Sequence, residues 1–225
     1  MRRLIFPVLL GLAGTLVLAS LGMWQMQRMA WKEGILADMQ ARIHDAPVSL
    51  PESPAQDQDQ FLSVQVSGTY LSGDLPVLAS NRDVGALFRI VAPFQIDNGR
   101  TILVDRGYVL DELLDRPRPA GDATLIGNLH WPDEINSSTP DPDLKAGIWF
   151  ARDIPAMAKA LGTEPTLLVV RETSETNIEI TPFPVDTAAI PNNHFSYAVQ
   201  WFGFALVWAC MSLLLIWRQT RKNEG

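Results

Sequence analysis

The histidine that is the best candidate metal ligand in this sequence lies in the stretch PNNHFSYAVQWFGF, residues 191–204. A neutral imidazole is a common metal ligand. If a helix begins near this histidine, one face carries His194, Ala198, Trp201, Ala205 and Trp208, with Tyr197 beside it. The two alanines leave a shallow slot between the aromatic rings, which a partner helix or the flat edge of a macrocycle could occupy. The helix N-terminus also disfavours a protonated imidazole, so a lone pair stays available for a metal.

The same residues also fit a purely structural role. Trp and Tyr are the usual anchors at a membrane interface, which would account for Tyr197 and Trp201. His194 could equally hydrogen-bond to a neighbouring folded domain. The residue types therefore leave metal ligation and anchoring as alternatives.

A second set of candidate residues lies near the other end of the chain. Met23, Met26 and Met29 are spaced like the thioether ligands of a Cu(I) site, although methionine is also a common filler of packed interfaces. Arg28 shares a helical face with Trp24 and with Trp31, so its guanidinium could stack on either ring.

Both sets adjoin apolar stretches long enough to cross a membrane. Residues 4–23 carry no charge, and 20 helical residues span roughly 30 Å, the hydrocarbon thickness of a bilayer. A cleaved signal peptide is the alternative, but no small-x-small site follows, which favours an uncleaved anchor. We predict transmembrane helices at residues 4–23 and 194–217. One face of the first carries Gly11, Thr15, Leu18 and Gly22, which predicts close packing against the second span or a partner helix.

Flanking charges predict the orientation of these spans. Basic residues precede the first span and follow the second, so the tails 1–3 and 218–225 are expected in the cytoplasm. With Glu224, the tails carry a net charge of +4, which leaves −11 for the rest of a chain whose net charge is −7. An acidic middle segment argues against nucleic acid and anionic lipid as partners. Residues 24–193 are then expected outside the cytoplasm.

This middle segment is expected to fold as an α+β domain with an antiparallel sheet or a small barrel. Alternating or β-rich runs predict strands at 61–70, on both sides of Asn98-Gly99, at 123–131 and at 166–173. A short helix is expected over 152–162, with Asp153 near its N-cap and Gly162 at its end. Residues 24–43 should continue the first span as an amphipathic helix, and the proline-rich residues 45–60 should form a loop.

The sequence lacks the motifs of common enzymes. It has no GxSxG, no HExxH, no phosphate loop and no dinucleotide fingerprint. The single cysteine, Cys210, lies in the second apolar stretch and cannot form an internal disulfide. The three histidines, His44, His130 and His194, are far apart in sequence, which still allows them to meet in space.

Three motifs together resemble the signature regions of the surfeit locus family of cytochrome c oxidase assembly factors. They are LGMWQMQRMAWK (21–32), LVDRGYV (103–109) and NNHFSYAVQWFGFA (192–205). The resemblance covers nearly the whole chain, including the two spans and the acidic domain between them. Asp105 and Tyr108 depart from the Asn and Trp that the family usually has at these positions.

The resemblance implies a non-enzymatic role in assembling a haem–copper cytochrome c oxidase, near the insertion of haem a into subunit I. Haem A synthase is a second candidate partner. A transiently bound haem a would have His194 as its iron ligand, and the other candidate contacts are Tyr197, Trp201, Trp24 and Arg28. The alternative is a scaffold that holds assembly intermediates and binds no cofactor.

Two further expectations follow from the resemblance. Arg82, Arg89 and Arg106 could neutralise haem propionates, but ordinary ion pairs are the better expectation in so acidic a domain. No Arg- and Ser-rich transit peptide precedes the first span, which favours a bacterial inner membrane with the central domain in the periplasm.

Overall fold

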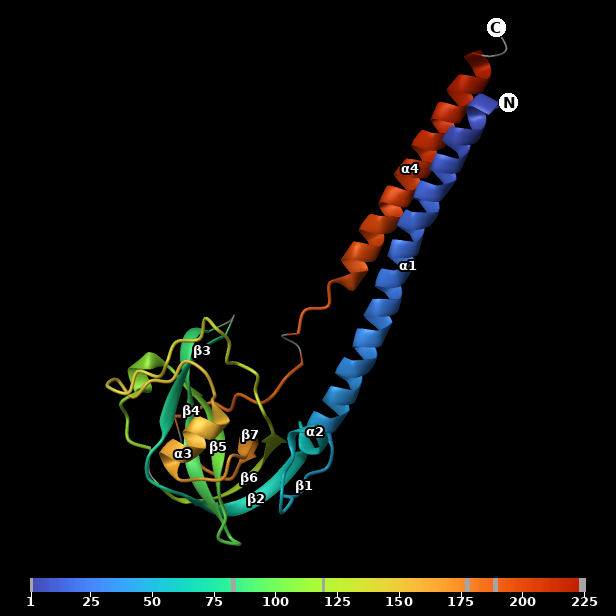
Figure 1. Ribbon diagram of the computed structural model, residues 1–225. Coiled ribbons are helices and arrows are strands. Elements are labelled where there is room, and N and C mark those ends of the chain that lie inside the picture. Colours follow the sequence, from blue (N-terminus) through green and yellow to red (C-terminus); the bar gives the residue numbers. More distant parts are fainter. Residues whose placement is uncertain (1, 82–83, 119, 177–178, 188–189, 223–225) are drawn as a thin grey trace. The chain divides into compact units, whose positions relative to one another are not determined.

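Two compact units make up the chain in the computed structural model, which describes residues 2–81, 84–118, 120–176, 179–187 and 190–222. One unit comprises residues 1–38 and 187–225 and is a pair of long helices. The other, residues 39–186, is a barrel domain. Figure 1 labels the elements of both units.

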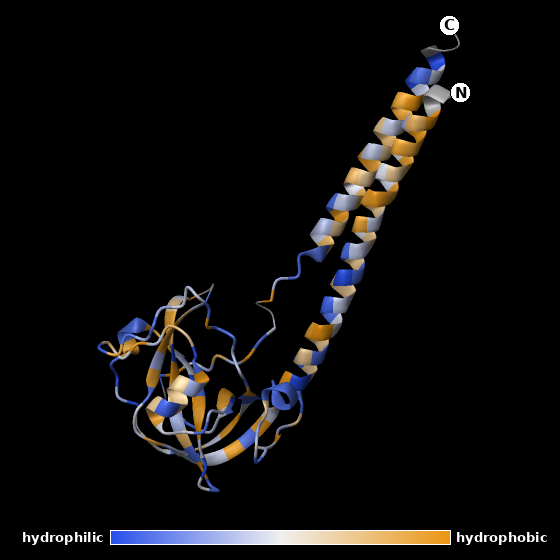
Figure 2. Ribbon diagram, in the orientation of Figure 1, coloured by the Kyte–Doolittle hydropathy of each residue, from blue (hydrophilic) through white to orange (hydrophobic). Residues whose placement is uncertain are grey.

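The helical unit consists of α1 (Arg2–His44) and α4 (His194–Lys222). Each helix contains an apolar window long enough and sparsely charged enough to cross a membrane (Figure 2). α1 runs on without interruption to His44, so the predicted helical extension over 24–43 is confirmed. The apolar residues of that extension do not all point the same way. Ile43 is buried, whereas Trp31 and Ile35 are exposed.

Small residues on α1 let the two helices approach closely. A Cβ added to Gly11 would lie 2.7 Å from Cβ of Ser212, and one added to Gly22 would lie 2.8 Å from the Phe202 ring. The later glycine of α1 contacts the earlier residue of α4, so the two helices are antiparallel. The predicted packing of the Gly11–Gly22 face against the second span is therefore confirmed.

Seven strands form one sheet in the order β1-β2-β6-β7-β5-β4-β3, and an additional β2–β4 pairing closes the five central strands into a barrel. The strands are β1 (Val48–Ser49), β2 (Ser63–Tyr70), β3 (Leu75–Asn81), β4 (Gly85–Ile96), β5 (Thr101–Val109), β6 (Asp122–Leu129) and β7 (Leu167–Thr173). The other elements are α2 (Gln56–Asp59), the 3-10 turn η1 (Asp111–Leu113) and α3 (Ile154–Leu161). The expected α+β class and the barrel are confirmed.

The sheet is mixed, because β7 runs parallel to β5. The chain leaves β6, passes through α3, and returns as β7 between β5 and β6. That long crossover allows a parallel neighbour, which a tight hairpin cannot provide. The other pairings around the closed barrel are antiparallel.

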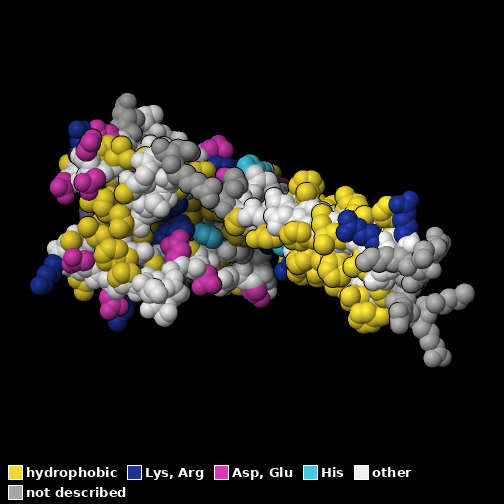
Figure 3. Space-filling view, turned by 90° about the horizontal axis from the view of Figure 1, so that it is seen from above, with side chains coloured by type: hydrophobic (Ala, Val, Ile, Leu, Met, Phe, Trp, Pro, Cys, Tyr) yellow, Lys and Arg dark blue, Asp and Glu magenta, His cyan; other side chains and the backbone are white. Residues whose placement is uncertain are grey.

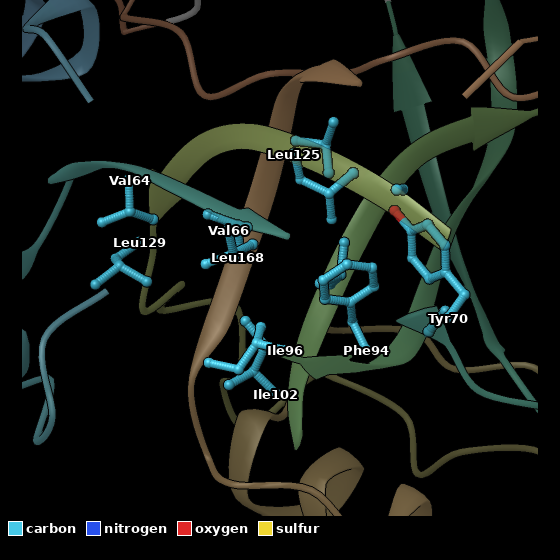
Figure 4. Close-up of a cluster of buried hydrophobic side chains, with 13 residues drawn as sticks. Val64, Val66, Tyr70, Phe94, Ile96, Ile102, Leu125, Leu129 and Leu168 are labelled. Carbon is cyan, nitrogen blue, oxygen red and sulfur yellow. The ribbon is translucent and has the colours of Figure 1, made fainter. Parts of the chain in front are cut away.

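Alternation along the strands fills the barrel interior. Val64 and Val66 of β2 point inwards, and Figure 4 shows them among the buried side chains of the neighbouring strands. The hairpin between β4 and β5 turns at the predicted Asn98-Gly99, where Gly99 takes the left-handed φ of 89°. At the start of α3, Asp153 accepts a hydrogen bond from the Ala156 amide at 3.0 Å, and Gly162 ends the helix with φ 68°. Each of these features follows the sequence prediction.

Candidate functional site

His194 is the first residue of α4, and its imidazole is fixed by a residue of α1. Nδ1 of His194 lies 2.8 Å from Oε1 of Gln25, and the imidazole is half-buried. An amide oxygen only accepts hydrogen bonds, so Nδ1 must carry the proton. In the neutral imidazole with this tautomer, the other ring nitrogen, Nε2, holds the lone pair that a metal would use.

A second contact ties the approach to α4 onto the same helix. Nζ of Lys32 donates to the carbonyl oxygen of Pro191 at 2.7 Å. Gln25 and Lys32 are seven residues apart, which is about two turns of α1, so both project from one side of it. The entry of α4 is therefore held to α1 at two points, Pro191 and His194.

The alanine slot predicted on α4 is filled by α1. Ala198 and Ala205 are 1% and 7% exposed, and they lie on the face of α4 that packs on its partner helix. Of the two occupants expected for this slot, the structure contains the helix. Trp201 is half-buried beside the alanines, and its ring makes an edge contact with Phe204 at 6.1 Å.

The remaining predicted site residues lie on exposed helix surfaces. Trp24 and Tyr197 are 54% and 51% exposed. The guanidinium of Arg28 sits 3.8 Å from the centre of the Trp31 ring, which confirms the predicted stacking for that pair. Within the described residues, no hydrogen bond or ring contact joins Trp24, Arg28 or Tyr197 to the histidine.

The three methionines of α1 do not share one environment. Met26 and Met29 are half-buried on the side of α1 that faces α4, whereas Met23 is 55% exposed. This arrangement favours packing as the role of Met26 and Met29. Among the described residues, no group of three His, Cys, Asp or Glu side chains gathers to hold a metal ion either.

Sequence reasoning missed Gln25, although a signal was present. A glutamine just beyond an apolar span is costly to bury without a partner. It also lies three residues beyond Gly22 and seven before Lys32, on the side of α1 that contacts α4. A polar residue on the packed face of such a helix is therefore a candidate partner for a polar residue on the other one.

The barrel domain holds a buried charge network built around Asp105 of β5. Arg89 of β4 donates from Nε to Oδ2 of Asp105 at 2.6 Å, and Arg152 donates from Nη1 to the same oxygen at 3.1 Å. Arg152 also binds Glu134, from Nη2 to Oε1 at 2.5 Å. Burial by itself raises the pKa of Glu134, but the hydrogen bonds and charge of Arg152 outweigh it, so the pKa of this carboxyl lies below its usual range.

The arginine of the LVDRGYV motif, Arg106, is also paired. Nη2 of Arg106 donates to Oε1 of Glu175 at 2.5 Å, and its guanidinium lies 4.1 Å from the centre of the Tyr70 ring. Burial, followed by the charge of Glu175, raises the pKa of Tyr70. The expected ion pairs are therefore confirmed for Arg89 and Arg106, while Arg82 lies outside the described residues.

The glycine of the same motif has a steric role. Gly107 takes φ +120°, and a Cβ there would lie 2.1 Å from the carbonyl oxygen of Thr181. The next residue, Tyr108, exchanges two backbone hydrogen bonds with Thr181. The segment that leads out of the barrel therefore rests directly on the LVDRGYV strand.

His130, at the end of β6, is held as a neutral acceptor. The Trp131 amide donates to Oε1 of Gln60, so Nε2 of Gln60 is the donor that faces Nδ1 of His130 at 3.2 Å. Burial, together with the charge of Arg152, lowers the pKa of His130 to about 4. The three histidines of the chain have separate partners, since His44 contacts the Gln40 carbonyl oxygen.

The motifs, the two apolar helices and the barrel can be compared with known proteins. The SURF1 family profile matches residues 12–206. The chain belongs to the SURF1 family. It is 29% identical over 224 residues to surfeit locus protein 1 of Xenopus tropicalis, covering 88% of this chain and 70% of that protein. It is 27% identical over 217 residues to the SURF1-like protein of Rickettsia felis, covering 92% of this chain and 93% of that protein.

SURF1 proteins are assembly factors of cytochrome c oxidase and are not enzymes. The matched region includes the whole barrel domain, the Gln25–His194 contact, most of α1 and the first part of α4. The family match therefore includes residues of both units of this chain.

Proposed function

We propose that this protein delivers haem a, or assists its insertion, into subunit I of a haem–copper cytochrome c oxidase. In this proposal haem a is a cargo, and Nε2 of His194 is an axial ligand to its iron. The observation that carries it is the 2.8 Å contact between Nδ1 of His194 and Oε1 of Gln25. A hydrogen bond from the remote ring nitrogen fixes the tautomer and ring orientation that metal-ligating histidines usually have.

The surroundings of His194 suit a cargo that must be released. α1 fills the alanine slot, so a haem would lie against the outer surface of the helices, where Tyr197 and Trp24 present exposed rings. Arg28 makes no ion pair with a carboxylate within the described residues, unlike Arg89 and Arg106, so it is the better candidate to meet a propionate. An open site near the membrane interface would let a partner reach the bound haem.

One observation favours the alternative, a scaffold without a cofactor. The slot that could have seated a macrocycle is closed by α1, with Ala198 almost fully buried. An exposed surface of aromatic side chains around Tyr197 and Trp24 would then be a contact for an oxidase subunit.

The optical spectrum of the protein purified from cells that make haem a separates the two functions. The wild type should carry a Soret band, and His194→Ala should abolish or shift it while the protein still inserts and folds. Tyr197→Ala, at an exposed ring of that outer surface, should weaken haem retention but keep the ligation signature. His44→Ala is the matched control, because His44 is an exposed histidine of α1, and its spectrum should match the wild type. A wild type without haem in such cells would establish the scaffold.

The proposal also includes partners and a location. Subunit I receives the haem, and haem A synthase is the candidate donor. The barrel domain would lie in the periplasm of a bacterium, with both basic tails in the cytoplasm, as the flanking charges favour. A reporter fused after Gly225 should be cytoplasmic, and a tag inserted at residues 51–60 should be protease-accessible from the periplasmic side. A periplasmic C-terminus would contradict this orientation.

A further inference from the structure

A groove runs between α1 and α4 at the ends of the helices that carry the basic tails. Its volume is about 390 Å³, and its walls include Phe6, Leu10 and Gly11 of α1 and Trp208, Leu215 and Gln219 of α4. The lining is mostly apolar, and it differs from the residues around His194. At one end the groove joins a second hollow of about 670 Å³, which shares Met211, Leu215 and Gln219 with it and reaches Trp217, Arg218 and Arg221.

The length of the groove matches one leaflet of a bilayer. From Trp208 to Gln219 the helix rises about 16 Å, at about 1.5 Å per residue. Half of a hydrocarbon core that is about 30 Å thick is about 15 Å. At its inner end the groove closes where Gly14 meets Trp208, because a Cβ on Gly14 would lie only 2.2 Å from the indole nitrogen. A third transmembrane helix would need about twice this length, so one acyl chain is the better fit.

The open end of the groove is positively charged. Neither Arg218 nor Arg221 forms an ion pair with a carboxylate in the described part of the chain. The guanidinium of Arg221 lies 4.4 Å from the centre of the Trp217 ring, which holds it at the level of the interfacial tryptophan. Figure 3 shows basic side chains beside the hydrophobic side chains at the end of the helical unit. Guanidinium groups bind phosphate oxygens in a bidentate manner, and basic pockets between membrane helices bind anionic headgroups.

We infer that this groove binds an anionic phospholipid, with one acyl chain between the helices and the phosphate at Arg218 and Arg221. The acidic residues that argue against anionic lipid lie in the segment between the two spans, whereas none of the described residues that line this groove is acidic. Such a lipid would fill the space between α1 and α4 where the side chains leave it open. It would thereby stabilise the helix pair from the end opposite to His194.

The test uses the full-length protein in detergent, with phosphatidylglycerol or phosphatidylcholine added, and counts retained lipids by native mass spectrometry. The wild type should retain phosphatidylglycerol at least about fivefold over phosphatidylcholine, and Arg218→Gln with Arg221→Gln should remove that preference. The matched control is Lys145→Gln with Lys159→Gln, which removes the same charge from two exposed residues of the barrel domain. It should keep the wild-type preference.

A second pair of variants tests the apolar part of the site. Leu215→Trp fills the groove and should lower phosphatidylglycerol retention, while Leu213→Trp adds the same ring at a 66% exposed residue outside the lining and should not. Equal retention of the two lipids by the wild type, or unchanged retention in the double arginine variant, would overturn the inference. A photo-crosslinker at residue 215 that labels a protein and no lipid in native membranes would also overturn it, by showing a partner helix there.

Discussion

Asp105 accepts a hydrogen bond from Nε of Arg89 at 2.6 Å, and its carboxylate has no exposed surface. The same oxygen accepts from Arg152, so one buried negative charge serves two guanidinium groups. The surfeit locus family usually has Asn at this position. An amide could accept these hydrogen bonds, but it would balance neither positive charge.

Asp105→Asn should therefore destabilise the barrel domain by about 3 kcal/mol, the usual cost of leaving a buried charge without its partner. Denaturant unfolding followed by near-UV circular dichroism measures this change. Glu179→Gln is the control, because its partner Arg116 is 60% exposed and such pairs contribute less than about 1 kcal/mol. Equal effects of the two variants would show that the buried network is not stabilising.

Gln25 should tune the iron that His194 is proposed to bind. A carboxylate at this position would accept the Nδ1 hydrogen bond more strongly and make the imidazole a stronger donor to iron. We expect Gln25→Glu to lower the reduction potential of the bound haem and Gln25→Leu to raise it, as measured by redox titration of the Soret band. Gln27→Glu, at an exposed residue of the same helix, should leave the potential unchanged. Identical reduction potentials in all three variants would show that Gln25 does not influence the haem iron.

Close helix packing should depend on Gly14 and Gly22. A leucine at either position must displace the ring of Trp208 or Phe202, so the double variant Gly14→Leu with Gly22→Leu should separate the helices and lower oxidase assembly. Cysteines placed at residues 15 and 209 would report the separation as a loss of crosslinking. Gly203→Leu is the matched control, since a Cβ there meets nothing within 4 Å. Wild-type crosslinking in the double variant would contradict this packing.

Local sequence signals predicted much of the fold. The alternation of Val64 and Val66, the turn at Asn98-Gly99 and the cap at Asp153 each depend on a few adjacent residues, and all three are present. β3 was not predicted, because its residues 75–81 carry a proline and mixed polarity. Its place depends on pairing with β4, and sequence periodicity does not reveal such long-range pairing.

The site was harder to predict for a similar reason. The face of α4 with His194, Ala198 and Trp201 follows from helical geometry, so it could be proposed from the sequence alone. What covers that face depends on the register between two helices about 170 residues apart. The Gln25–His194 contact and the filled alanine slot both result from that register.

His130 should make the barrel domain less stable in acid. Its pKa is about 4 in the folded protein and 6.5 in an unfolded chain, so only the unfolded state takes up a proton as the pH falls below 6.5. The free energy of unfolding should therefore decrease between pH 6.5 and pH 4, by up to about 3 kcal/mol, since each pKa unit corresponds to about 1.4 kcal/mol. The charged groups around the imidazole are Arg152, Glu134, Arg89 and Asp105, with burial as the largest cause of the lowered pKa.

The variant His130→Gln removes this titration while keeping a polar side chain opposite Gln60. Melting temperatures of the full-length protein between pH 7.5 and pH 4.5 should fall steeply for the wild type and less steeply for His130→Gln. Glu134 should add little to this slope, because its lowered pKa stabilises the fold at every pH above the usual glutamate pKa of about 4.3, and that effect is lost only below it. His44→Gln, at an exposed histidine, should retain the wild-type slope. If His130→Gln kept the full slope as well, other groups would be responsible for the acid sensitivity. The lowered pKa of His130 would then be contradicted.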